Sequence, residues 1–278
     1  MAANGTMLGE YLRAQRDRVR PDQVGLPGGS NRRVRGLRRS EVALLAGISV
    51  DYYLRLEQGR DRNPSPEVLE ALARVLGLDS ISTSYLLSLA ERRPTQSDDR
   101  PQGWEPVPDG VGKLLHSLNL PAFVENRYFD VLAANSLAAS ISPRLVVGDN
   151  RLRAVFLDRD ERNLYSDWED TTARLVAGFR RSVGADTNTP RCTELVDELS
   201  LASERFRTVW AHNDVQALQN WPLVISHPVV GELTLNREKL GIGDTAQSLA
   251  LAIYHPDPGT DSADKLRLLA SRAPVTDS

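Results

Sequence analysis

The sequence predicts an α+β protein with two domains: an all-helical domain of five helices, and then a domain in which helices pack on a small antiparallel sheet. The first observation is length, because 278 residues exceed what one small helical domain needs. The second is periodicity, because apolar residues recur at helical spacing through residues 6–93, whereas alternating strand-like segments occur only within residues 113–273. The third is composition, since residues 94–112 contain four prolines and three glycines and predict a linker.

The amino-terminal helices can be placed in order. The first is expected over residues 6–18, before a loop punctuated by glycine and proline at residues 21–35. Two short helices follow within residues 39–58. A fourth helix opens on a serine–proline pair and spans residues 65–77, and a fifth spans residues 80–92.

Residues 39–58, RSEVALLAGISVDYYLRLEQ, carry the most specific pattern in the chain. Gly47 can adopt the positive φ that ends a helix, and Ser49 can accept from the free N–H groups that start the next one. Ala43 is small enough for two helices to cross close to it. Five side chains have spacings that point into a common core: Val42, Leu45, Ile48, Tyr53 and Leu56. The pattern predicts a helix-turn-helix that reads DNA.

The second helix of this pair, and the arginines around it, indicate the DNA contacts. Four residues lie on its outer face, where a recognition helix meets base edges: Val50, Asp51, Tyr52 and Arg55. A helix N-terminus flanked by arginines is suited to binding phosphate. Eight residues around the pair are predicted to contact DNA phosphates: Arg32, Arg33, Arg35, Arg38, Arg39, Arg60, Arg62 and Asn63.

The net charge differs between the two predicted domains. Residues 1–93 contain 15 arginines against 11 acidic residues, whereas the rest of the chain carries 19 basic and 26 acidic residues. The overall charge of −3 therefore combines a basic amino-terminal domain with an acidic remainder. This asymmetry predicts one domain that meets phosphate and one that does not.

The carboxy-terminal domain shows a mixed pattern. A short helix is expected from residue 113, followed by a strand hairpin with a polar turn at residues 125–127 and a helix that begins within residues 133–139. Further helices are expected at residues 151–158, 168–183, 191–202, 203–215 and 261–271. Three more strands are expected at residues 221–228, 230–240 and 247–256. This order predicts a small antiparallel sheet with helices packed on one face.

The sequence also indicates the cellular compartment in which the protein resides. It has no run of about eighteen apolar residues and no apolar stretch of signal-peptide type near its beginning, so we expect no membrane span. The single cysteine, Cys192, rules out an intramolecular disulfide framework and fits a reducing compartment. We therefore expect a cytoplasmic protein.

Catalytic chemistry has little support in the sequence. The four histidines lie far apart and lack the spacing of metal ligands: His116, His212, His227 and His255. His212 and Asp214 are two residues apart on a predicted helix, so they point to different faces. The sequence contains no dinucleotide-binding loop, phosphate-binding loop or nucleophile-elbow motif. We expect neither an enzyme nor a metal or cofactor site.

Residues 36–79, GLRRSEVALLAGISVDYYLRLEQGRDRNPSPEVLEALARVLGLD, resemble the amino-terminal domain of the xenobiotic-response-element (XRE) superfamily of repressors. More narrowly, they resemble the MmyB-like regulators. The resemblance implies that the four residues predicted to contact bases face the major groove. It also implies that Arg39, Arg60 and Asn63 lie near the DNA backbone.

Four later segments resemble the ligand-binding domain of the same family, whose fold is similar to PAS sensor domains: PAFVENRYFDVLAAN, FLDRDERNLYSDWE, FRTVWAHNDV and HPVVGELTL. The resemblance implies a PAS-like domain over residues 113–273 and an apolar ligand, such as a fatty acyl chain, between sheet and helices. Two departures stand out. Asn213 replaces a histidine common in the family, and the usually basic stretch before His227 is apolar here.

Large aromatic side chains in the segments that frame such a cavity are the candidate ligand contacts: Phe179, Phe206, Trp210 and Trp221. Plain core packing is the alternative for each of them. For the whole chain we predict a transcription regulator that binds a palindromic operator as a homodimer and senses an apolar small molecule. The alternative is a DNA-binding protein whose second domain only dimerises or docks a protein partner. An empty, mainly apolar cavity of a few hundred Å³ would favour sensing, and a filled core would favour the alternative.

Overall fold

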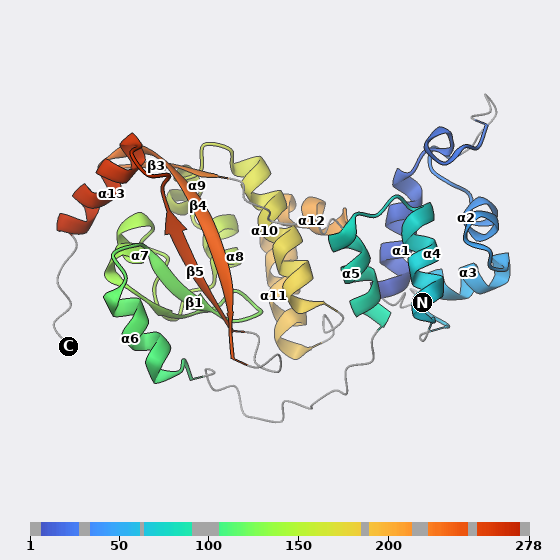
Figure 1. Cartoon of the computed structure of the whole chain (residues 1–278), viewed down its shortest axis with the longest axis horizontal. Helices are drawn as coiled ribbons and strands as arrows, with labels where there is room; N and C mark the ends of the chain where they lie inside the picture. Colours follow the sequence, from blue (N-terminus) through green and yellow to red (C-terminus); the bar gives the residue numbers. More distant parts are fainter. Residues whose placement is uncertain are drawn as a thin grey trace. The chain divides into compact units, whose positions relative to one another are not determined.

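The computed structural model describes residues 7–27, 34–61, 64–90, 106–184, 189–212, 222–243 and 249–272. They fall into two units, an all-helical amino-terminal unit and a carboxy-terminal unit in which helices pack on a five-stranded antiparallel sheet (Figure 1). The predicted α+β class is confirmed. Among the described residues, none of the helices combines the length and the apolar character that crossing a bilayer requires.

All five helices predicted for the amino-terminal unit are present. They are α1 (Met7–Arg18), α2 (Arg39–Ala46), α3 (Val50–Glu57), α4 (Pro66–Val75) and α5 (Ser80–Ala90), with a 3-10 turn, η1, at Pro21–Val24. Ser65 occupies the cap position of α4 and Pro66 is its first residue, where a missing N–H loses no helical hydrogen bond. The helices enclose one core that includes Tyr11, Tyr53 and Leu72.

The prediction that Leu45 belongs to the core of this unit is wrong. Leu45 is 39 % exposed, whereas the other four predicted core residues lie in the core or at its edge. Helix α2 has only eight residues and buries the face that carries Val42 and Ala43. Leu45 lies about 60° around the helix from Val42, on the side away from Ala43, so it falls at the edge of the buried face. Its side chain is therefore partly exposed.

Helices α1 and α3 approach each other closely at Gly9. A Cβ atom at this position would lie 2.3 Å from the carbonyl oxygen of Glu57. No side chain fits there without moving a backbone, so the crossing requires glycine. The same approach places the end of α3 beside Arg16 of α1.

The carboxy-terminal sheet joins strands from both ends of its unit. The strands are β1 (Ala122–Glu125), β2 (Val131–Ala134), β3 (Leu223–His227), β4 (Gly231–Ile242) and β5 (Leu249–His255). Their order is β2-β1-β5-β4-β3, and all pairings are antiparallel. The predicted hairpin and the three late strands are confirmed. Phe123 of β1 pairs with Ala252 of β5, so the first and last strands are neighbours.

The helices of this unit follow the prediction with local differences. They are α6 (Asp109–Ser117), α7 (Ser136–Ile141), α8 (Arg151–Leu157), α9 (Arg159–Asn163), α10 (Trp168–Val183), α11 (Pro190–Ala202), α12 (Glu204–Ala211) and α13 (Asp261–Arg272). Helix α6 begins four residues before the predicted start, and α9 was not predicted. Glu125 was predicted in the hairpin turn but ends strand β1. Helix α7 starts only after Asn135, because the two preceding alanines pair with β1.

The prediction that helices pack on one face of the sheet is wrong, because α6 packs on part of the other face. Successive strand residues point to opposite faces. Phe123 packs in the core beneath α7 and α13, whereas its neighbours Ala122 and Val124 pack with Leu115 of α6 on the other face. Strand β1 is buried at every position and β5 at nearly every position, so each presents side chains to both layers.

Asn135 fastens the start of α7 to the sheet. Its side-chain oxygen accepts hydrogen bonds from the backbone N–H groups of Ala122 (3.1 Å) and Ala138 (3.0 Å). Its amide nitrogen donates to the carbonyl oxygen of Leu120 at 2.8 Å. One buried side chain thus caps a helix and satisfies backbone groups of the neighbouring segment.

We expect Asn135→Ala to lower the free energy of unfolding by about 2–4 kcal/mol, because it removes a helix cap and leaves buried backbone groups without partners. Urea denaturation followed by tryptophan fluorescence measures the change. Asn236→Ala is the control, since the Asn236 amide bonds Asp257 at the surface, and a change below about 0.5 kcal/mol is expected there. Equal losses in the two variants would contradict the role given to Asn135.

Candidate nucleic-acid interface and ligand cavity

The turn between α2 and α3 has the predicted geometry. Gly47 has a φ of 69° and ends α2, with its N–H directed to the carbonyl oxygens of Ala43 and Leu44. The Ser49 hydroxyl oxygen accepts from the backbone N–H of Tyr52 at 3.1 Å and caps α3. The two helices are therefore held in a fixed arrangement by their own turn.

The four residues predicted to contact bases share the outer side of α3. Val50 is 45 % exposed, and Asp51 and Arg55 are also exposed. Tyr52 is half-buried, and the Arg55 guanidinium lies over its ring, 5.5 Å from the centroid. Arg55 Nε also lies 4.0 Å from Asp61 Oδ2. The side chain of Arg55 is therefore positioned by the Tyr52 ring, and its contact with Asp61 is long.

The structure describes four of the eight residues that were predicted to contact phosphates. Arg35, Arg38 and Arg60 are exposed near the ends of α2 and α3. The backbone N–H of Arg38 donates to Glu41 Oε2 at 2.7 Å at the start of α2. Four of the predicted positions lie outside the described residues: Arg32, Arg33, Arg62 and Asn63. Contact of any of these residues with DNA stays a prediction.

Arg39 has a structural partner that the sequence analysis missed. Its Nε donates to Glu57 Oε2 at 2.6 Å, while Arg16 Nε donates to Glu57 Oε1 at 2.7 Å. Arg16 also donates to the carbonyl oxygen of Leu37 at 2.9 Å. One buried carboxylate therefore joins the helices α1, α2 and α3. The Arg39 side chain keeps 45 % of its surface exposed, so it remains accessible at the start of α2.

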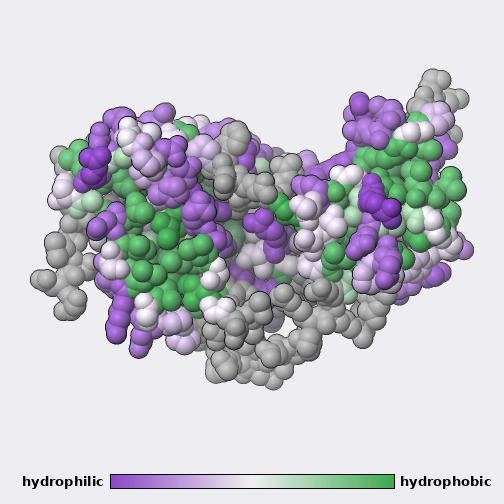
Figure 2. Space-filling model, viewed as in Figure 1, coloured by the Kyte–Doolittle hydropathy of each residue, from purple (hydrophilic) through white to green (hydrophobic). Residues whose placement is uncertain are grey.

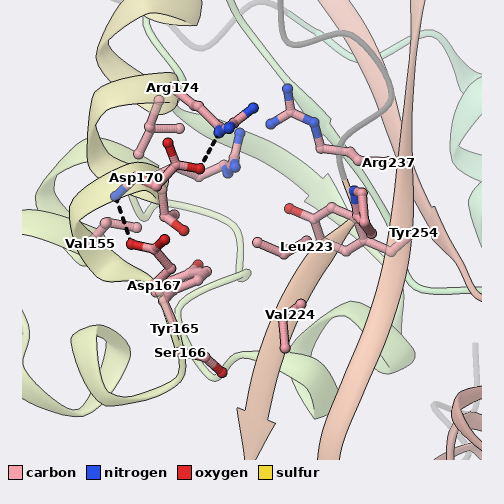
Figure 3. Close-up of a pocket in the computed structure, with 14 residues that line it drawn as sticks. Val155, Tyr165, Ser166, Asp167, Asp170, Arg174, Leu223, Val224, Arg237 and Tyr254 are labelled. Carbon is pink, nitrogen blue, oxygen red and sulfur yellow. Dashed lines mark hydrogen bonds and ion pairs between the residues drawn. The ribbon is translucent and has the colours of Figure 1, made fainter.

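A cavity of about 340 Å³ lies in the carboxy-terminal unit between α8, α10 and the inner face of the sheet (Figure 3). Its lining residues are Arg151, Val155, Tyr165, Ser166, Asp167, Asp170, Thr171, Arg174, Leu175, Pro222, Leu223, Val224, Arg237 and Tyr254. This volume falls within the range of small-molecule sites. The lining surface is mainly apolar, as the prediction required, but the residues that form it also include arginines and aspartates.

Figure 3 shows how the two kinds of side chain are distributed. Leu223 of β3 points across the cavity toward the α10 side, where Val155 lies beside Asp167 and Asp170, whereas Arg174 and Arg237 direct their guanidinium groups toward one another. Arg174 belongs to α10 and forms an ion pair with Asp170 one helical turn away. A molecule in this cavity would therefore meet apolar groups and, near Arg174 and Arg237, two guanidinium groups.

Behind the charged end lies a second shared carboxylate, Glu125. Arg151 Nη1 binds Glu125 Oε2 at 2.8 Å, and Lys239 Nζ binds Glu125 Oε1 at 2.8 Å. Burial of the fully enclosed carboxylate opposes its ionisation, but the charges of Arg151 and Lys239 outweigh that effect and lower the pKa of Glu125 to about 2. Glu125 is therefore ionised at neutral pH.

The predicted ligand contacts lie elsewhere in this unit. Phe179 and Phe206 are fully buried, and both pack against Trp210, with ring centroids 5.9 Å and 5.8 Å apart. None of the three lines the described cavity. Val155, Leu175 and Tyr165 lie between them and the cavity, because these residues belong to or pack against the same core and also line the cavity. Direct ligand contact by these aromatic residues stays a prediction, and Trp221 lies outside the described residues.

The order of side chains along β4 is a sequence signal that could have indicated the cavity. Residues 233, 235, 237 and 239 of β4 point to the inner face because strand side chains alternate. The first two of them are leucines and the last two are Arg237 and Lys239. The inner side of β4 thus changes from apolar to basic along the strand, which the predicted strand boundaries alone did not reveal.

Comparison with protein families gives two matches. The model of the MmyB-like transcription regulator ligand binding domain matches residues 107–269, which is more than half of the chain. The model of a helix-turn-helix domain matches residues 7–82. The comparison with curated proteins gives no match. The first match contains every residue that lines the cavity, and the second contains α2 and α3.

Proposed function

Because the chain belongs to the MmyB-like transcription regulators, we propose that its carboxy-terminal domain binds an apolar, fatty-acid-like small molecule and thereby sets the DNA affinity of its helix-turn-helix domain. The observation that carries the proposal is the cavity of about 340 Å³ inside the matched ligand-binding domain. A ligand acts on DNA binding only through a difference in its affinity for two conformations.

On the DNA side, we propose an XRE-type reader with α3 in the major groove. The exposure of Val50, Asp51 and Arg55 supports base contact by this helix. The exposed Arg35, together with Arg38 at the start of α2, supports phosphate contact beside it. The net positive charge of residues 1–93 favours association with a polyanion.

We also propose that the protein acts as a homodimer through the outer face of the sheet. Figure 2 shows an apolar area over the strands of the carboxy-terminal unit. Leu240 is 53 % exposed and pairs with Leu251, whose side chain packs on the outer face with α6. Leu114 of α6 is 44 % exposed. Exposed apolar surface of this kind is typical of an association site.

The alternative, a carboxy-terminal domain that only dimerises or docks a partner, draws on the same outer face. It requires no occupant in the cavity. Mass spectrometry of small molecules released from the purified native protein separates the two functions. A bound apolar molecule supports sensing, and an empty domain that still dimerises supports the alternative.

We expect Arg55→Ala to weaken binding to a cognate operator by about 1–3 kcal/mol and to relax sequence preference at one position, because it removes a base contact. Arg74→Ala is the matched control, since Arg74 is an exposed arginine on α4 and its loss changes the charge equally. Fluorescence anisotropy on operator and scrambled duplexes provides the measurement. If both variants bind the operator like the wild type, α3 is not the recognition helix.

A homodimer predicts an operator with two half-sites about 10 bp apart, or a multiple of that spacing. We expect Leu240→Asp to shift the protein toward monomer, because the charge would have to be buried in the interface. Sedimentation velocity at micromolar concentration measures the change. Leu201→Asp is the control, since Leu201 is 85 % exposed on α11. A wild-type chain that is monomeric with and without DNA would contradict the dimer.

Ligand affinity should rise with chain length until the cavity is filled, because each buried methylene contributes about 0.8 kcal/mol. Thermal-shift titration with fatty acids from hexanoate to tetradecanoate measures this dependence, and operator binding is measured alongside. Leu223→Trp should reduce the shift by occupying the cavity, whereas Val229→Trp, at an exposed turn, should not. A flat series with unchanged operator affinity would leave the domain as a dimerisation module.

A further inference from the structure

The outer side of α3 holds one arginine between two carboxylates. Arg55 is the basic residue of this helix, and the exposed Asp51 lies one turn before it on the same side. After the helix, Gly59 adopts a φ of 66° and turns the chain back. The backbone N–H of Asp61 then donates to the carbonyl oxygen of Arg55 at 3.3 Å, which places the second carboxylate beside the arginine.

These carboxylates decide which part of a DNA duplex the arginine can meet. Two acidic side chains and one basic side chain give this surface a net negative charge, which phosphate groups repel. Base edges are different, because they offer amino groups that donate to a carboxylate and acceptors that suit a guanidinium. The outer side of α3 is therefore suited to base edges, whereas the exposed Arg35 and Arg38 near the start of α2 are suited to phosphates.

The guanidinium of Arg55 lies on a ring that is itself held in place. Tyr52, three residues earlier on α3, is half-buried and packs against the core of the amino-terminal unit. The Arg55 guanidinium carbon lies 5.5 Å from the centroid of its ring. A guanidinium that rests on an aromatic ring loses less conformational freedom when it binds a partner. The ring therefore prepares Arg55 for one direction of contact.

The remaining donors of Arg55 point to an outside partner. Among the described residues, Asp61 is its ion-pair partner, with Oδ2 at 4.0 Å from Nε. The contact is on the Nε side, so the two terminal nitrogens can bind an acceptor from outside the chain. The Arg55 side chain keeps 50 % of its surface exposed. Such a pair of parallel donors matches two acceptors that lie side by side.

We infer that Arg55 reads a guanine of the operator through N7 and O6 in the major groove, and that Tyr52 is a positioning residue for this contact. The inference rests on the proposed DNA-reading function and adds the base that is read. Guanine alone presents two adjacent acceptors on its major-groove edge. Adenine places an amino donor beside N7, and a guanidinium, which has donors only, cannot pair with it there.

The test begins with the wild-type full chain and a random duplex library, from which bound sequences are selected. Each guanine of the selected sequence is then replaced in turn by 7-deazaguanine, which lacks N7, or by inosine, which lacks only the minor-groove amino group. Fluorescence anisotropy should show one guanine in each half-site at which 7-deazaguanine weakens binding about tenfold. Inosine at the same position should change the affinity less than about twofold, because its major-groove acceptors are intact.

Substitution of the arginine assigns the contact to a residue. With Arg55→Ala, 7-deazaguanine at the sensitive position should change the affinity less than about twofold, because the partner of N7 has been removed. Arg74→Ala is the matched control, since Arg74 is an exposed arginine on α4. This control should keep the full sensitivity to 7-deazaguanine.

Substitution of the ring tests the positioning role. The readout is the ratio of affinities for duplexes with guanine and with adenine at the sensitive position. Tyr52→Phe keeps the ring and should leave this ratio unchanged, whereas Tyr52→Leu should lower it about threefold. The affinity of Tyr52→Leu for a scrambled duplex should stay at the wild-type value, because a purely structural loss would weaken binding to every duplex.

The outcomes separate this inference from the proposed function. If the selected sequence tolerates 7-deazaguanine at every position, the guanine contact is overturned while sequence-specific DNA binding stands. If Arg55→Ala keeps the full sensitivity, another residue reads the guanine and the inference is overturned. Equal discrimination by Tyr52→Leu and Tyr52→Phe would overturn the positioning role. If the wild-type chain enriches no sequence from the library, both the inference and the proposed DNA-reading function fail.

Discussion

The architecture of the carboxy-terminal unit depends on the pairing of β1 with β5. These strands come from the beginning and the end of the unit, and their register places Phe123 opposite Ala252 and Glu125 opposite Ala250. Without this pairing the early hairpin and the late strands would be separate small sheets, which are marginal alone. The pairing also carries Glu125 onto the inner face, where Lys239 of β4 and Arg151 of α8 meet it. The cavity and its charged end follow from that register.

The amino-terminal unit also contains a buried carboxylate that binds two basic side chains. Glu57 ends α3 and binds Arg16 of α1 and Arg39 of α2, which ties the recognition helix to the two helices around it. Gly9 permits the close crossing of α1 and α3 beside it. The orientation of α3 is therefore set by a buried ion pair and by backbone contact, in addition to apolar packing. A helix held in this way can present its outer residues without relying on the DNA to order them.

The sequence was sufficient to predict features that depend only on residues close together in the chain. Gly47, Ser49 and Pro66 each act through their own backbone conformation or a nearby N–H group, and the structure places all three as predicted. Leu45 was misplaced because its spacing fits a helix face, and only the position of the neighbouring helices decides which face is buried. Glu125 was misplaced because a polar residue beside a turn is usually exposed, and the partners that bury it are distant in sequence.

The cavity was harder to predict for the same reason. Its lining comes from α8, α10, β3, β4 and β5, so no short segment reveals it. The aromatic residues chosen from the sequence are large and apolar, and such side chains pack against one another first, as Phe206 and Trp210 do. The lining instead combines charged residues, short side chains and two tyrosines, Tyr165 and Tyr254.

Both units share one electrostatic arrangement, a buried carboxylate bound by two cations from other elements. Around Glu57 the two arginines are balanced, because Arg16 Nη1 also lies 2.7 Å from Asp17 Oδ1. Around Glu125 one carboxylate binds both Arg151 and Lys239, and Arg237, which lines the cavity, adds a further positive charge nearby. Both sites are therefore fixed in place by ion pairs, and the one beside the cavity also keeps an excess of positive charge.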